Sequence, residues 1–212
     1  MINFADGWSV SETSSLAIKA ARGVGMPWGI AEEAGFALRW LTRSGAPGVA
    51  AICRYLSAYQ RAMKLTKAGS KSATGCEWNC PLRLGTAISD GGITLPLEQS
   101  RVCEPVLLLP FLASQATDSH SIVLEMGTKS IIVSEEGFST NLVEAAMLIE
   151  KAECTINFGS ADTNVTKRIG KRIDLTASEH IETLTRFAHN TYAPATEESR
   201  MSGAGAGPNE ND

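Results

Sequence analysis

The chain has 212 residues, of which 43% are hydrophobic and 20% charged, enough apolar material for the core of one domain. Its formal net charge of −4 argues against a nucleic-acid partner, because phosphate-binding surfaces need a clustered excess of Lys and Arg. The chain has no apolar run of about 18 residues and no N-terminal signal of cations and apolar residues, so we expect a cytoplasmic protein without membrane segments.

The first part of the sequence predicts a layer of three amphipathic helices within residues 9–65. Apolar residues recur there at spacings of three and four, Ser9 or Ser11 offers an N-cap, and glycines end the runs. Gly35 lies inside the second helix, where glycine costs roughly 1 kcal/mol relative to alanine. We therefore expect close approach at Gly35, most simply by another helix.

A Lys-, Ala-, Gly-, Ser- and Thr-rich linker at 66–75 precedes a strand-rich region at 82–160. There, short β-branched and apolar runs alternate with Gly, Pro, Ser and Asp. The runs at 121–126 and 130–137, separated by Gly127, Thr128 and Lys129, predict a hairpin.

Two segments of this region allow more specific expectations. Pro105 and Pro110 flank the run Val-Leu-Leu-Leu, so we expect a strand with the prolines at its ends or on a sheet edge. Residues 141–153 are rich in Ala, Met, Glu and Leu and favour a short helix.

A final helix at 176–192 has Thr176 or Ser178 as its cap. We expect one α+β domain at 1–194, with a helical layer, a central antiparallel-rich sheet covered on one face and a C-terminal helix. The Gly/Ala-rich acidic tail at 195–212 completes the chain, either frayed or ordered against a surface.

Metal, cofactor and nucleotide signatures are weak. Cys76 and Cys80 are separated by three residues, but no second pair of ligands follows at matched spacing. The glycine runs do not follow a strand and open a helix, as a phosphate loop requires. We therefore predict no metal and no cofactor.

The predicted second helix carries a candidate site. Spacings of three and four bring Trp28, Glu32, Phe36, Arg39 and Trp40 close to one stripe. If buried beside aromatic rings, Glu32 would be a catalytic acid or base, with Trp28 and Arg39 binding a substrate. The alternative is that both tryptophans belong to the core, an acid caps the helix start, and Arg39 pairs with a neighbour.

A second polar cluster follows the last predicted helix. Tyr192 is a candidate catalytic residue, and Glu197, Ser199 and Arg200 are candidate substrate-binding residues. The glycines beyond them would let the tail close over a site as a lid, or dock into a second chain.

The block LAIKAARGVGMPWGIAEEAG from Leu16 and the block TYAPATEESRMSGAGAGPNEND from Thr191 resemble a bacterial protein family known only as a domain of unknown function. The resemblance implies that the tail is a family feature, and it brings no activity, substrate or cofactor with it.

Two functions follow as hypotheses. The first is an enzyme, or a subunit of one, acting on a small polar metabolite, with Glu32 as acid or base, Arg39 or Arg200 as anion clamp, and the tail as lid. The second is a non-enzymatic assembly partner whose tail docks into another protein chain, with the helical layer as an interface and a homo-oligomer as a possible assembly.

Overall fold

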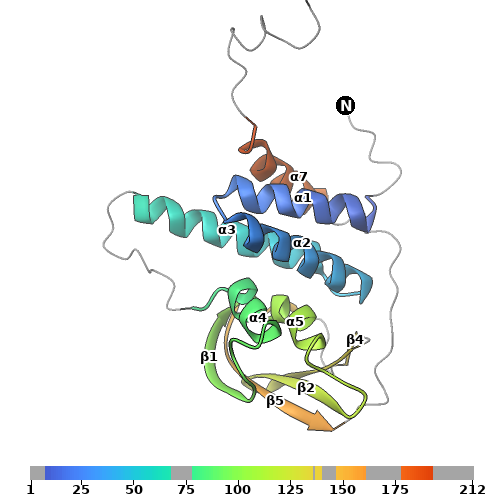
Figure 1. Ribbon diagram of the computed structural model, residues 1–212. Coiled ribbons are helices and arrows are strands. Elements are labelled where there is room, and N and C mark those ends of the chain that lie inside the picture. Colours follow the sequence, from blue (N-terminus) through green and yellow to red (C-terminus); the bar gives the residue numbers. More distant parts are fainter. Residues whose placement is uncertain (1–7, 68–77, 136, 140–146, 161–177, 193–212) are drawn as a thin grey trace, which may run out of the picture.

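The computed structural model describes residues 8–67, 78–135, 137–139, 147–160 and 178–192. In these ranges a layer of long helices lies over two shorter helices, which cover one face of an antiparallel sheet (Figure 1). The fold is α+β with helices at the N-terminal end, as the sequence predicts. One continuous core is buried between the helical layer and the sheet.

The helices are α1 (Val10–Gly23), α2 (Trp28–Arg43), α3 (Gly48–Lys67), α4 (Pro81–Ser89), the 3-10 helix η2 (Pro105–Leu108), α5 (Leu109–Ala113) and α7 (Ser178–His189). The strands are β1 (Leu97–Cys103), β2 (His120–Met126), β3 (Lys129–Ser134), β4 (Gly137–Ser139) and β5 (Lys151–Ser160). None of the helices in the described ranges has the length and apolarity needed to cross a membrane.

Helix α1 begins with a complete capping box. The Ser9 hydroxyl accepts the backbone N–H of Glu12 at 3.2 Å, and the Glu12 carboxylate accepts the backbone N–H of Ser9 at 2.9 Å. Two N–H groups that the helix leaves unpaired are satisfied in this way. Of the two predicted caps, Ser9 is the one used.

Small residues let α1 and α2 lie close together. Both helices carry alanines with no exposed surface, namely Ala17, Ala20, Ala21, Ala31, Ala34 and Ala37. At the crossing, a Cβ on Gly35 would lie 2.5 Å from Cγ1 of Ile18 and 3.1 Å from the backbone oxygen of Ser14. The Ser14 hydroxyl donates a hydrogen bond of 2.9 Å to the Gly35 carbonyl. The close helix approach predicted at Gly35 is confirmed.

The sheet has the order β1-β5-β2-β3-β4, and all its strand pairings are antiparallel. The predicted hairpin is β2–β3, in which Met126 pairs with Lys129 across a turn at Gly127 and Thr128. Gly127 has a φ of 61°, which glycine adopts without steric cost. The buried faces of β2 and β3 present Ile122, Leu124, Ile131 and Val133 to the core.

Residues 105–113 are helical, so the strand expected between Pro105 and Pro110 is wrong. Each proline lies in the first turn of its helix, η2 or α5, where its missing N–H removes no helical hydrogen bond. The leucines between them favour a helix and are fully buried. A short apolar run does not by itself distinguish a buried strand from a buried helix.

Other boundaries also differ from the sequence expectation. The strand-rich region begins with helix α4, and β1 lies between two of the expected runs. Of the helix expected at 141–153, residues 141–146 lie outside the described ranges, whereas 151–153 belong to β5 and pair with β1. The linker expected at 66–75 lies mostly outside the description as well.

A buried ion pair joins the helical layer to the sheet. Nε of Arg54 on α3 donates to Oε1 of Glu104 at 2.8 Å, and Nη2 of Arg54 donates to Oε2 of Glu104 at 2.7 Å. The same Nη2 donates to the carbonyl of Met147 at 3.2 Å. The Glu104 side chain is only 4% exposed, and its residue follows β1 directly. Two-point contact of this kind fixes the orientation of both side chains.

Candidate ligand-binding groove

An open groove of about 630 Å³ lies where α1 and α2 meet α4 and α5. Its lining combines carboxylates, hydroxyls, one guanidinium and apolar side chains, from Ser14, Ile18, Glu32, Glu33, Phe36, Arg39, Thr86, Ser89, Asp90, Phe111, Ser114 and Gln115. A concave surface of mixed apolar and polar character is typical of sites for small molecules. It is the candidate functional site of the described part of the chain.

The apolar floor of the groove is an aromatic pair. The rings of Phe36 on α2 and Phe111 on α5 meet edge to face, with centroids 5.6 Å apart and planes at 66°. Phe111 lies directly against Gly85 of α4, where any Cβ would overlap its ring. The glycine therefore allows α4 and α5 to approach and sets the position of the floor.

Hydroxyl groups form one rim of the groove. The Ser114 hydroxyl donates to the Phe111 carbonyl at 2.6 Å, and the hydroxyls of Ser89 and Ser114 lie 3.0 Å apart. These bonds link the C-terminal ends of α4 and α5. The rim is thus held by side chains that also offer oxygen atoms to a ligand.

Negative charge gathers beside this rim. Glu33 of α2 is half-buried, and burial raises the pKa of its carboxyl above the usual value, with the charges of Asp90 and Glu32 raising it further. Asp90 is the C-cap residue of α4, at the negative end of that helix dipole. Within the described ranges, neither Glu33 nor Asp90 has an ion-pair partner. The groove therefore favours positive charge at this end.

The stripe predicted on α2 is partly brought together. Glu32 and Arg39 line the groove, but Glu32 is exposed and its Oε1 accepts a hydrogen bond of 2.9 Å from Nε1 of Trp28. Trp28 itself is 62% exposed, lies outside the groove lining and stacks with Arg22, whose guanidinium carbon is 5.6 Å from the ring centre. The half-buried Trp40 packs against the core and Phe138 of β4, so the core alternative holds for Trp40, whereas it is wrong for the exposed Trp28.

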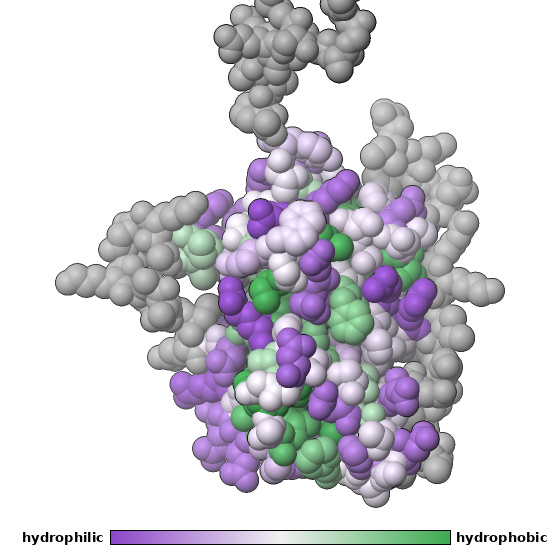
Figure 2. Space-filling view, in the orientation of Figure 1, coloured by the Kyte–Doolittle hydropathy of each residue, from purple (hydrophilic) through white to green (hydrophobic). Residues whose placement is uncertain are grey.

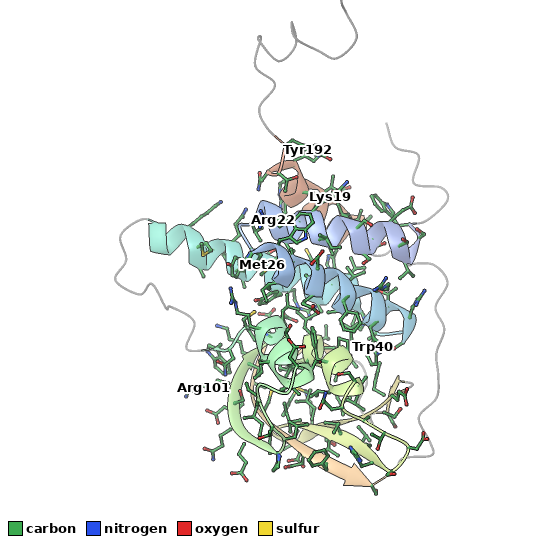
Figure 3. All side chains as sticks on the ribbon, in the orientation of Figure 1. Lys19, Arg22, Met26, Trp40, Arg101 and Tyr192 are labelled. Carbon is green, nitrogen blue, oxygen red and sulfur yellow. The ribbon has the colours of Figure 1, made fainter. Side chains whose placement is uncertain are left out.

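Tyr192 lies in a different place from Glu32. It is 62% exposed and lines a second groove of about 340 Å³ between α1 and α7, together with Trp8, Lys19 and His189. Figure 3 shows Tyr192 and Lys19 at the end of the molecule farthest from the sheet, away from α4 and α5. The two predicted catalytic residues therefore do not share a site in this arrangement.

The remaining predicted residues, Glu197, Ser199 and Arg200, lie outside the described ranges, as does the tail at 195–212. Its role as a lid stays a prediction. Tyr192 is the last described residue before the tail, and it lines the α1–α7 groove.

Sequence reasoning missed most of the groove's second wall. Thr86, Ser89 and Asp90 come from α4, and Phe111 comes from α5, both in a region expected to be strands. One signal could have found α4: Pro81 at its first position and apolar residues at Leu82, Leu84 and Ile88 before the pair Gly91-Gly92.

Cys80 and Cys154 take structural positions, whereas Cys76 lies outside the described ranges. Cys80 is the N-cap of α4, at a loop-to-helix junction, and its sulfur accepts hydrogen bonds from the Tyr55 hydroxyl at 2.8 Å and the Arg83 backbone N–H at 3.4 Å. Burial raises the pKa of Cys154 to about 12, which holds this thiol in its protonated form. In the described part of the chain, no three His, Cys, Asp or Glu residues are grouped as metal ligands.

The fold and groove define an α+β protein with an N-terminal helical layer. Residues 8–77 match a family described as a protein of unknown function (DUF3726), a stretch that includes α1, α2 and α3. The match agrees with the resemblance stated for the N-terminal block; the C-terminal block lies beyond it. Comparison with curated proteins and with solved structures finds no match to the chain.

Proposed function

We propose that the protein binds a small polar molecule in the groove between α2 and α4, as an enzyme or an enzyme subunit. The observation that supports the proposal most is the groove itself, whose lining combines carboxylates of α2 and of the end of α4, an arginine of α2 and an aromatic pair. Polar groups that converge in a concave, partly apolar site are the usual arrangement for a small ligand.

In this proposal Glu33, rather than Glu32, is the acid or base. Glu32 is exposed and already accepts the Trp28 indole N–H, whereas Glu33 is half-buried beside like charges. A carboxyl with a raised pKa exchanges protons closer to neutral pH, which suits general acid–base catalysis. Arg39 keeps the anion-clamp role predicted for it.

The energetic position of Glu33 supports the same proposal. A carboxylate placed beside two others, without an ion-pair partner in the described ranges, lowers the stability of the folded protein at neutral pH. Positions that reduce stability while lining a cleft are characteristic of functional sites.

A thermal-shift screen of small amines, amino acids and carboxylic acids against the full chain tests the proposal. We expect at least one compound to raise the midpoint of unfolding for the wild type and to lose that effect in Glu33→Gln. The matched control is Glu182→Gln, which removes an exposed carboxylate on α7, outside both grooves. Equal shifts for wild type and Glu33→Gln with every active compound would contradict a role for this groove.

A second function, assembly with another protein chain, is favoured by Trp28. This side chain is 62% exposed, yet Glu32 and Arg22 hold it in one orientation. Fixed, exposed tryptophans are enriched among the residues that dominate binding between proteins. In the space-filling view, hydrophilic side chains surround scattered apolar ones over the helical part of this face, without one broad apolar patch (Figure 2). Size-exclusion chromatography of the wild type and of Trp28→Ala in a cell extract tests assembly. If the two proteins elute at the same volume, the result counts against assembly through Trp28.

A further inference from the structure

The α2 face of the groove carries opposite charges at its two ends. Glu33 lies near the start of α2 and Arg39 lies six residues later, and both side chains line the groove. At 1.5 Å per residue, six residues separate the two positions by about 9 Å along the helix axis. Since no ion pair joins the two side chains in the described ranges, an extended ligand suits contacts at both ends.

The surface between these charges is apolar. Phe36 lies midway between Glu33 and Arg39 in the sequence of α2, and its ring meets that of Phe111 across the groove. Ile18 of α1 joins them and contacts the helix at Gly35. The middle of an extended ligand would lie on hydrocarbon, so methylene groups fit there better than hydroxyl groups.

The negative end has contributions from two elements. Asp90 faces Glu33 from the C-cap of α4, where the helix dipole adds to the negative potential, and Glu32 stands beside them. Among the lining residues in the described ranges, Arg39 is the one cation. Three carboxylates and one guanidinium leave a local formal charge of −2, which favours an ammonium group at the Glu33 end.

We propose that the ligand class of this groove is a linear ω-amino acid, with an ammonium group between Glu33 and Asp90 and a carboxylate at Arg39. A chain of about five methylene groups, matched to the rise of six helical residues, lies on Phe36 and Ile18, the half-buried apolar side chains of the lining. The inference rests on the proposed function of the same groove and specifies its substrate class. An α-amino acid without a cationic side chain is too short to contact both ends, because its ammonium and carboxylate share one carbon.

Isothermal titration calorimetry of the full chain with 6-aminohexanoate tests this inference. Hexylamine lacks the carboxylate, hexanoate lacks the ammonium, and glycine lacks the length. We expect 6-aminohexanoate to bind at least about tenfold more tightly than any of the three, because one charged hydrogen-bonding end is worth about a factor of ten.

Two variants separate the ends of the ligand. Glu33→Gln is expected to weaken 6-aminohexanoate about tenfold and to leave hexanoate unchanged, whereas Arg39→Met is expected to weaken 6-aminohexanoate and to leave hexylamine unchanged. Amide NMR shifts that fall on residues 33–39 and 86–90 on adding 6-aminohexanoate would locate binding in the groove.

The outcomes distinguish the inference from the proposed function. If hexylamine or hexanoate binds in the groove as tightly as 6-aminohexanoate, the ligand class is wrong and the groove remains a binding site. If none of the four compounds binds, the ligand class is wrong, and the thermal-shift screen alone decides the proposed function. If 6-aminohexanoate binds but the NMR shifts fall outside the groove, the inference is overturned.

Discussion

Two partly or fully buried carboxylates of this molecule differ in whether a cation pairs with them. Glu104, at the junction of the helical layer and the sheet, is almost fully buried and receives two hydrogen bonds from Arg54. Glu33, in the groove, is less buried, yet it stands beside Asp90 and Glu32 with no counter-ion in the described ranges. The first charge is paired inside the protein, whereas the second has no ion-pair partner in the described ranges.

Both carboxyl groups have a raised pKa, but for different balances of causes. Burial raises the pKa of Glu104, and the hydrogen bonds that Arg54 donates oppose this rise while they raise the pKa of Arg54. For Glu33, burial and both neighbouring charges act in one direction and raise its pKa. The comparison teaches that degree of burial alone does not decide whether a carboxylate is paired within the protein.

The largest effect is expected from breaking the satisfied pair. Glu104→Gln leaves Arg54 half-buried without its counter-charge, which should cost about 3–5 kcal/mol of unfolding free energy. Urea denaturation followed by circular dichroism measures this loss. The double variant Arg54→Met with Glu104→Leu removes both charges and should recover much of the stability. If Glu104→Gln lowers the unfolding free energy by less than about 1 kcal/mol, the ion pair does not hold the helical layer to the sheet.

A smaller loss of stability is expected for a substitution in α2, the helix that carries Glu33. Gly35→Ala places a methyl group 2.5 Å from Ile18 Cγ1 and 3.1 Å from the Ser14 backbone oxygen, so overpacking should cost about 1–3 kcal/mol. The matched control is Gly29→Ala in the same helix, where a Cβ meets nothing within 4 Å. That change should gain up to about 1 kcal/mol through helix propensity. Thermal melts of the two variants measure this difference in stability. Equal midpoints of unfolding would contradict the expected overpacking at Gly35.

The smallest expected effect is a gain in stability, from a substitution of Glu33. Glu33→Gln removes a charge that burial, Asp90 and Glu32 disfavour, so it should stabilise the protein at pH 7 by no more than about 1 kcal/mol, given solvent screening. The folded pKa is raised above the ordinary 4.5, so the cost of the charge is absent below pH 4.5 and grows as pH rises through the folded value.

Melting curves of wild type and Glu33→Gln at pH 4 and pH 7 test this sign. Arg39 is the one cation among the lining residues in the described ranges, and it forms no ion pair with Glu33 there. A wild type that is more stable than the variant at pH 7 would mean that Glu33 is paired.

The sequence predicts the helical layer well because its signals are local. The capping serine, the repeat of small and apolar residues, and the glycine at the helix crossing all act within a few residues, and α1 and α2 follow them. The hairpin β2–β3 is predicted for the same reason. The sequence does not predict helix α5, because an apolar run between prolines fits either a strand or a helix. Phe111 of this helix packs against Phe36 of α2, a tertiary contact that no local pattern shows.

The groove could be predicted only on one side. The α2 stripe identifies Glu32 and Arg39, which line the groove, but spacing within one helix does not show which of two adjacent glutamates is half-buried. Asp90 lies 57 residues after Glu33 in the sequence, and no local pattern brings the two together. The wall opposite α2 is a product of tertiary packing.

The position of β5 has a consequence for how the chain acquires its fold. This strand is the last one in the described ranges, yet it lies between β1 and β2 and pairs with both. Likewise α7, the last described helix, packs on α1, the first, with the backbone of Phe187 directly against Gly23. Such contacts between distant parts of the chain slow folding, because the loop between them must close first. A chain interrupted during synthesis before residue 151 would expose the edges of β1 and β2 together, the kind of open strand that promotes aggregation.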